Sequence, residues 1–305
     1  MSQGELAPFG SALPAAYPAG ASWEDGSFIL SERARRHRWQ GVGQLSIKTF
    51  PVGEAYYSVG SARYLLDSRA YLVLNEGQSY EIDVAADTPV ESFCVFFAPG
   101  AALDAQRALT ARTEALLDDP HAPSPDAAAG FFERLYPHDD LVSPQLEHIR
   151  GALAQPETER LWLAERMREA LMRLCAAHQR VWGEVNALPA VRVSTREEIY
   201  RRLYYARDYA VALLHEPLTL DELARVAVMS PTHFLRVFRQ AFGQTPHQFL
   251  TERRIERAKD LLRMTNRPVT DICLAVGFES LGSFSALFRR RVGVSPAAYR
   301  RLNAD

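Results

Sequence analysis

The chain contains few residues of several types, and each shortage excludes certain classes of protein. Lysine occurs twice, at Lys48 and Lys259, and cysteine three times, at Cys94, Cys175 and Cys273, without a CxxC pair. An odd number of isolated cysteines argues against a disulfide scaffold or a zinc cluster and fits a reducing cytoplasm. No apolar run approaches the roughly 20 residues of a membrane helix, and the first residues do not resemble a signal peptide. We therefore expect a cytoplasmic protein without membrane contact.

Catalytic motifs are missing as well. A metal-dependent enzyme on a cupin barrel needs clustered histidine and carboxylate ligands, typically an H-x-H pair on one strand. Residues 23–100 contain one histidine, His37, and no H-x-H pair occurs anywhere. The nucleophile elbow, the P-loop and the Rossmann fingerprint are absent too. We expect a protein that is not an enzyme and has no cofactor and no metal; a cupin enzyme fused to a DNA-binding domain is a remote alternative.

The net charge of −2 conceals two parts of opposite sign. Residues 1–195 hold 17 basic and 25 acidic side chains, net −8, whereas residues 196–305 hold 18 and 12, net +6. Such asymmetry is typical of a basic nucleic-acid-binding part joined to an acidic part with another role. The alternative is chance clustering of solvated surface charge.

The composition divides the first half into a tail, a strand-rich segment and a helical segment. Residues 1–22 are rich in Ala, Pro, Gly and Ser and are expected to form a flexible tail. Residues 23–100 contain alternating and continuous apolar runs separated by turn residues. Short strands at about ten-residue spacing predict a small antiparallel β-barrel or sandwich.

Residues 101–188 are expected to form a helical dimerisation or accessory region, followed by a linker over 189–196. The clearest helix runs from about 157 to 185 and carries one apolar stripe. The stripe either packs on the barrel or forms a dimer seam. The residues proposed for dimerisation are Leu163, Met167, Leu171, Leu174 and Val181.

The most specific signal is an internal repeat. Residues 230–249 and 280–299 align at an offset of 50, with serine, phenylalanine, arginine, glycine and Thr/Ser-Pro at matching positions. Each copy reads as a short helix, a tight turn and a second helix, and in the first copy Thr219 to Glu222 is a capping box that opens the short helix. Serine caps the second helix and glycine ends it, at Ser230 and Gly243 in the first copy and Ser280 and Gly293 in the second. The sequence predicts two helix-turn-helix motifs with reading helices 230–242 and 280–292.

Between the two copies a helix runs from Thr245-Pro246 to about Met264. About 18 residues at 1.5 Å each span roughly 27 Å, close to one DNA turn of about 34 Å. One chain could therefore read two successive major grooves. The competing interpretation is an ordinary helical bundle with surface arginines.

Residues 197–303 resemble the DNA-binding domain of AraC/XylS-type transcription regulators. The resemblance rests on Ile272, Gly277-Phe278-Glu279-Ser280, Ser283-Phe284, Phe288-Arg289, Gly293, Ser295-Pro296 and Tyr299-Arg300. The first half is similar, less specifically, to the cupin-like effector and dimerisation domain of many members. The resemblance implies an α+β multidomain chain: an N-terminal antiparallel, cupin-like β-barrel plus helices, and a C-terminal all-α domain with two helix-turn-helix motifs joined by a long helix. It also implies a double-stranded DNA operator, a homodimer and, for an activator, RNA polymerase as partners.

The expected DNA contacts lie on the outer faces of the reading helices. Arg236 is the strongest candidate for base recognition, because a guanidinium bonds guanine O6 and N7 together; the alternative is a phosphate clamp or an ion pair. The second helix carries short side chains where many family members have Gln, Thr and Arg, so we expect looser reading there. The candidates are Thr232, His233, Leu235, Arg236, Arg239, Leu281, Gly282, Ser283, Ser285, Arg289 and Arg290, with Arg291, Arg300 and Arg301 as further phosphate contacts.

Two functions remain open for the first half. Strand aromatics could line a pocket for a small organic effector or could simply form the barrel core; the candidates are Tyr56, Tyr57, Tyr64, Tyr71, Tyr80, Phe93 and Phe96. Cys94 is expected to be a buried, inert thiol. The chain is then either a ligand-responsive regulator or a ligand-independent dimeric one.

Overall fold

The computed structural model describes residues 20–22, 26–110, 130–155, 158–188 and 192–303. The chain divides into two compact units, residues 1–187 (unit 1) and 188–305 (unit 2). The predicted tail lies outside the described residues except for 20–22, which form a strand.

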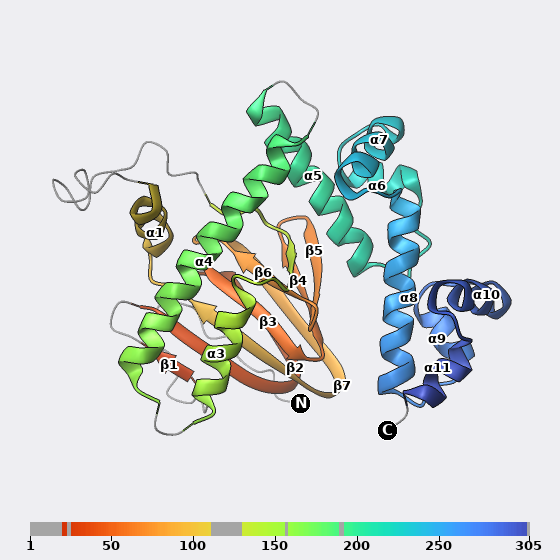
Figure 1. Ribbon diagram of the computed structural model, residues 1–305, viewed down its shortest axis with the longest axis horizontal. Coiled ribbons are helices and arrows are strands. Elements are labelled where there is room, and N and C mark those ends of the chain that lie inside the picture. The colour runs from red at the N-terminus through yellow and green to blue at the C-terminus, as the bar shows by residue number, and fades with distance from the viewer. Residues whose placement is uncertain (1–19, 23–25, 111–129, 156–157, 189–191, 304–305) are drawn as a thin grey trace. The chain divides into compact units, whose positions relative to one another are not determined.

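Unit 1 is built on an antiparallel sheet that curls into a nearly closed barrel (Figure 1). Its strand order is β1-β2-β7-β3-β6-β8, and the β4–β5 hairpin folds back to pair with β7. The strands are β1 (Gly20–Ser22), β2 (Phe28–Val42), β3 (Ser46–Val52), β4 (Glu54–Val59), β5 (Ala62–Asp67), β6 (Ala70–Leu74), β7 (Ser79–Phe96) and β8 (Leu135–Pro137). The predicted antiparallel barrel is confirmed, and β8 adds a strand from the region that the sequence predicts to be helical.

Strand β7 passes without interruption through Asp87-Thr88-Pro89, where the turn chemistry suggests a break. The pairing with β2 shifts there, from Ala34 opposite Val90 to Arg36 opposite Ala85. The residues between Ala85 and Val90 therefore bulge out of the ladder, which is where a proline is tolerated within a strand.

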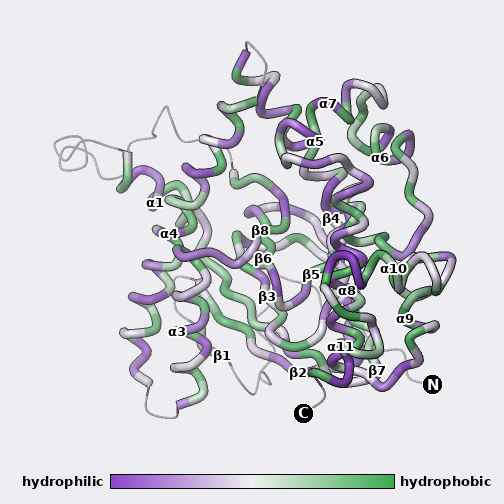
Figure 2. The backbone as a smooth tube through the Cα atoms, turned by 45° about the vertical axis from the view of Figure 1, so that its right-hand side comes forward, coloured by the Kyte–Doolittle hydropathy of each residue, from purple (hydrophilic) through white to green (hydrophobic). Residues whose placement is uncertain are grey.

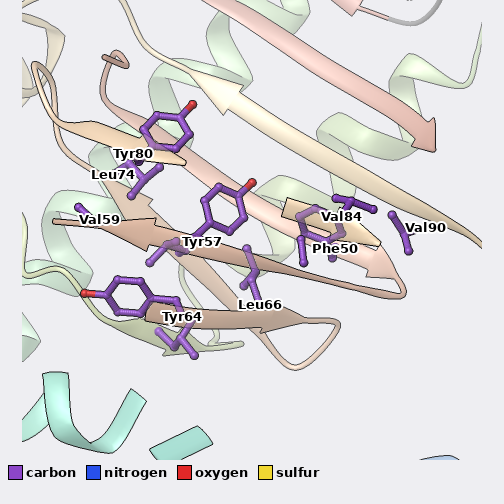
Figure 3. Close-up of a cluster of buried hydrophobic side chains, with 12 residues drawn as sticks. Phe50, Tyr57, Val59, Tyr64, Leu66, Leu74, Tyr80, Val84 and Val90 are labelled. Atoms are coloured by element: carbon purple, nitrogen blue, oxygen red, sulfur yellow. The ribbon is translucent and has the colours of Figure 1, made fainter. Parts of the chain in front are cut away.

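Side chains alternate between the two faces of β3 and its neighbours. Lys48 is in register with Leu72 and Cys94, whereas Thr49 is in register with Tyr71 and Phe93. Leu72 belongs to the barrel core, other members of which are labelled in Figure 3. The core consists of Phe50, Ala55, Tyr57, Val59, Tyr64, Leu66, Leu72, Leu74, Tyr80, Val84, Val90 and Leu135.

The helices of unit 1 are α1 (Ala101–Thr110), α3 (Ser143–Leu153) and α4 (Arg160–Asn186), and α3 and α4 lie across one face of the sheet (Figure 1). Figure 2 shows apolar and polar residues alternating along α4. The helix confirms the predicted stripe, and Leu163, Met167, Leu171, Leu174 and Val181 are all buried within unit 1. A dimer contact through α4 would therefore use its other face, where Leu161 and Trp162 are exposed.

Every regular element among the described residues of unit 2 is a helix. Its helices are α5 (Val193–Ala212), α6 (Leu220–Val226), α7 (Pro231–Phe242), α8 (Pro246–Met264), α9 (Val269–Ala275), α10 (Leu281–Val292) and α11 (Pro296–Leu302). Helix α5 begins four residues earlier than the predicted domain at 197, so residues 193–196 are helical rather than linker. Residues 189–191 lie outside the described residues.

Candidate nucleic-acid interface

The first helix-turn-helix consists of α6 and α7, and its caps are those predicted. The Thr219 hydroxyl accepts a bond from the Glu222 amide at 3.2 Å, while the Glu222 carboxylate accepts one from the Thr219 amide at 2.7 Å. These bonds hold the pKa of Glu222 below its usual range. The Ser230 hydroxyl caps α7, and Gly243 ends it with φ of 71°. The reading helix therefore has fixed ends.

The two faces of α7 differ sharply. Phe234, Val237 and Phe238 are buried, and the Phe242 ring lies tilted against Phe238 with ring centroids 4.5 Å apart. The opposite face is open to solvent, and its exposed candidates are Thr232, Leu235, Arg236 and Arg239. His233 is half-buried at the edge. An apolar face that anchors the helix leaves the polar face free to enter a groove.

The second helix-turn-helix consists of α9 and α10 and repeats the arrangement. The Ser280 hydroxyl accepts a bond from the Ser283 amide at 3.3 Å, and Gly293 ends α10 with φ of 90°. Phe284 and Phe288 are fully buried. The outer face exposes Leu281, Gly282, Ser283, Arg289 and Arg290, whereas Ser285 is half-buried.

The tight turns of the two motifs also correspond, at Val228 and Gly277, and sequence reasoning missed this pair. Val228 has a φ of 53° and Gly277 has a φ of 84°, so both residues adopt the left-handed backbone conformation. Val228 donates its amide to the Arg225 carbonyl, as Gly277 does to Leu274, each at 3.0 Å. A β-branched residue in the left-handed region is a genuine outlier. Upstream of the capping serines the two copies align at an offset of 49 rather than 50, as Leu223-Ala224 and Ile272-Cys273 do, and this was the signal that could have revealed the pair.

Arg202 of α5 braces the strained turn by donating to the Val228 carbonyl at 3.2 Å. Beside it lies a groove of ≈ 510 Å³ between the start of α5 and the first helix-turn-helix, another feature that sequence reasoning missed. The groove is lined by Ser194, Thr195, Glu198, Ile199, Arg202, Val228, Met229, Ser230 and His233.

Helix α8 connects the two motifs. Its 19 residues span about 28 Å at 1.5 Å each. Arg254, at its middle, donates to the carbonyls of Leu214 and Glu216, each at 2.7 Å. A Cβ added to Gly277 would lie 2.7 Å from that same Leu214 oxygen and 2.9 Å from the Arg254 guanidinium. Arg254 therefore ties the chain before α6 to the turn of the second motif.

The candidate arginines differ in how they are engaged. No ion pair between described residues involves Arg236, Arg239, Arg289 or Arg290, and all four are exposed. Arg291 instead approaches Glu252 at 3.5 Å. Arg300, expected to contact phosphate, is half-buried and donates to the Arg267 carbonyl. The four arginines without an ion pair are therefore the side chains available to bind the phosphate backbone of DNA.

In unit 1 the candidate effector residues separate onto two faces of the sheet. Tyr57, Tyr64 and Tyr80 belong to the barrel core, and Phe96 shares a strand face with Cys94. Tyr71 and Phe93 lie on the opposite face, and Tyr71 stacks on Tyr136 and donates to Asp139 at 2.7 Å. Tyr56 is half-buried under Arg63. The structure thus brings Tyr57, Tyr80 and Phe96 together and sets Tyr71 and Phe93 apart.

The barrel interior also holds Lys48, which sequence reasoning missed. It is 2% exposed, and its Nζ lies 3.3 Å from the Tyr80 hydroxyl and 3.5 Å from the centre of the Phe96 ring. Burial lowers its pKa to about 8. Burial also raises the pKa of the Cys94 thiol, in keeping with the expected inert cysteine.

The described residues contain no group of three or more His, Cys, Asp or Glu side chains placed to hold a metal ion. Among the helices of that same part of the chain, none is long and apolar enough to cross a membrane.

A helix-turn-helix domain family model matches residues 223–302. The probable transcriptional regulator LumQ of Photobacterium leiognathi is 33% identical over 93 residues, which are 30% of this chain and 38% of that protein. The right origin-binding protein of Escherichia coli is 35% identical over 88 residues, which are 29% of this chain and 30% of that protein. This chain thus spans well under half of these relatives. They are named as a transcriptional regulator and an origin-binding protein.

Among solved structures, an AraC-type DNA-binding-domain regulator from Chromobacterium violaceum is 29% identical, with 37% of this chain and 98% of that chain covered and a TM-score of 0.33. The family model confirms a helix-turn-helix domain in the C-terminal unit.

Proposed function

We propose that the whole chain is an AraC-type transcription regulator that recognises specific DNA sequences through α7 and α10, because unit 2 carries a helix-turn-helix domain. The observation that carries the proposal is the pair of motifs. Each has a buried phenylalanine face and an exposed outer face, and a single rigid helix separates them. A spacer of about 28 Å suits two helices that enter successive major grooves about one turn apart.

The roles of the side chains follow from their chemistry. Arg236 reads a guanine edge, and Thr232 and Leu235 contact neighbouring bases. The second helix offers Leu281, Gly282 and Ser283, which make apolar and sugar-phosphate contacts. Arg239, Arg289 and Arg290 neutralise phosphates and set the register of the protein on DNA.

The experiment is a selection of DNA from a random pool with the full-length chain at a stated salt concentration. The proposal expects an enriched sequence with two conserved blocks about ten base pairs apart. Binding to every duplex with equal affinity would contradict it.

For unit 1 we infer a regulatory role, in which the barrel takes up a small organic effector and the unit pairs two chains. The acidic character of residues 1–195, net −8, disfavours contact between this unit and the phosphate backbone. The ligand-independent dimer is the second candidate, because the aromatic side chains that would line a pocket also form the core of the barrel. Sedimentation of the full chain measures the dimer, and operator affinity with and without a bound ligand separates the two candidates.

A further inference from the structure

Lys48 is a buried ammonium group without a charged partner. It projects from β3 into the barrel, where its strand neighbours are Leu72 and Cys94. No ion pair between described residues includes it, and its one hydrogen bond is the contact of 3.3 Å with the Tyr80 hydroxyl. The Phe96 ring face stabilises the charge in part. Among the residues that the structure describes, two of its three N–H donors have no oxygen partner.

A buried lysine of this kind destabilises a fold. Transfer of an ammonium from water into an apolar interior is costly, and an apolar side chain of similar volume would be the more stable choice. Burial lowers the pKa of Lys48 to about 8, so the group is still mostly protonated at neutral pH. A perturbed titratable group in a pocket-forming fold is a candidate for function.

The groups around Lys48 share one property, which is the ability to donate a hydrogen bond. The Cys94 thiol lies close enough to Lys48, Tyr57 and Tyr80 to interact electrostatically with each, and the ring centroids of Tyr57 and Tyr80 are 6.0 Å apart. Burial raises the pKa of Tyr57, of Tyr80 and of Cys94, so all three keep their protons. Figure 3 shows the hydroxyls of Tyr57 and Tyr80 directed to the same side of the cluster, whereas that of Tyr64 points the other way.

Two glycines give the rings at this end of the barrel their positions. A Cβ on Gly43 would lie 2.6 Å from the Tyr80 ring, and one on Gly41 would lie 2.5 Å from the Trp39 ring. Trp39 is only half-buried and covers Tyr80 with ring centroids 4.8 Å apart. The donors around Lys48 are therefore covered by a side chain that reaches solvent.

We propose that this cluster is the recognition site for a small organic carboxylate, whose oxygens bind Lys48 Nζ and the Tyr80 hydroxyl while its apolar body lies against Phe96 and Trp39. The proposal rests on the proposed effector function of unit 1 and names the chemical class of the effector. A carboxylate supplies the acceptors that the cluster lacks and forms the strong, charge-assisted type of hydrogen bond.

The scarcity of lysine permits a direct test. In full-length protein labelled with ¹³C-lysine, only Lys48 and Lys259 give side-chain signals. Lys259 is the internal control, because it lies on α8 and pairs with Glu256 at 3.0 Å. Benzoate and hexanoate are expected to shift the Lys48 signal and leave that of Lys259 in place. The neutral isosteres benzamide and hexanamide are expected to move neither signal.

Two variants connect the signal to the site. Lys48→Met removes the charge at similar volume and should weaken benzoate and hexanoate binding at least tenfold, as measured by calorimetry. Tyr80→Phe retains the lysine and should weaken it by a smaller factor. A Lys48 signal that no carboxylate moves, or a Lys48→Met protein that binds both acids as tightly as the wild type, would overturn the proposal.

The same samples separate this site from the proposed function. If benzoate or hexanoate binds at Lys48 and operator affinity stays unchanged, the carboxylate site stands and the ligand-responsive function fails. If neither acid binds and the operator is still recognised, the site fails and DNA recognition stands.

Discussion

The two helix-turn-helix motifs of unit 2 have the same interior and different exteriors. Phe234 and Phe238 of α7 correspond to Phe284 and Phe288 of α10, all of them buried. Both helices begin at a capping serine and end at a left-handed glycine. The exposed faces share little, because one carries Arg236 and the other carries glycine and serine at its start. Packing holds the interior constant, while the outer face is free to match a different DNA sequence.

The turns of the two motifs show the same separation between backbone and side chain. The backbone requires a left-handed residue at Val228 and at Gly277. Only at Gly277 do close neighbours exclude a side chain, since 68% of Val228 is exposed. Conformation thus constrains both turns, but close packing constrains only the second.

The largest effect is expected for Gly277→Ala. The new Cβ would meet the Leu214 carbonyl oxygen at 2.7 Å and would occupy a left-handed backbone, so unit 2 should lose about 3 kcal/mol of stability. Hydrogen exchange of the α9 and α10 amides measures the loss. Tryptophan fluorescence is unsuitable, because all four tryptophans lie before residue 188. The matched control is Gly243→Ala, where φ is 71° and no atom lies within 4 Å of the new Cβ. If the two variants lost equal stability, close packing around Gly277 would not be the reason for its larger expected effect.

Arg236→Ala should produce the next largest effect. Loss of a bidentate guanine contact costs about 1–3 kcal/mol of affinity for the selected sequence, and random DNA should lose less. Fluorescence anisotropy on both duplexes measures the difference. Arg263→Ala is the control, because Arg263 on α8 is already paired with Asp260. Equal weakening on both duplexes would remove Arg236 from base recognition.

Val228→Gly should stabilise the first motif by about 1 kcal/mol, because glycine relieves the left-handed strain at a small entropic cost. Slower hydrogen exchange in α6 and α7 would reveal the gain, with α9 and α10 as the internal reference. Faster hydrogen exchange in α6 and α7 would mean that the valine side chain stabilises the turn through contacts.

Arg290→Ala should have the smallest effect. One lost phosphate contact lowers affinity a few-fold on every sequence and reduces the slope of log K against log salt by about 0.9. A titration of affinity between low and moderate salt measures the slope. An unchanged slope would place Arg290 outside the DNA contact.

The sequence predicted the elements whose determinants are local. The caps at Thr219, Ser230 and Ser280 and the terminal glycines lie within a few residues of the helices that they define. The repeat predicted both motifs. The strained turn at Val228 was missed because valine gives no local sign of a positive φ.

The features that escaped prediction in unit 1 depend on pairing between distant residues. The continuous strand β7 is held on both sides of Asp87-Thr88-Pro89 by its ladder with β2, against the local turn preference of these three residues. Lys48 lies in an alternating strand, but its burial follows from barrel closure, which periodicity does not encode. For the same reason the sequence did not separate the inner Tyr57 from the outer Tyr71.

The most direct test of the account is the DNA selection repeated with Arg236→Ala in the full-length chain. If α7 and α10 read separate grooves, the wild type enriches two blocks about one helical turn apart. The variant should lose sequence preference in one block and keep it in the other. Two blocks unchanged by the substitution, or no enriched sequence with the wild type, would contradict the account.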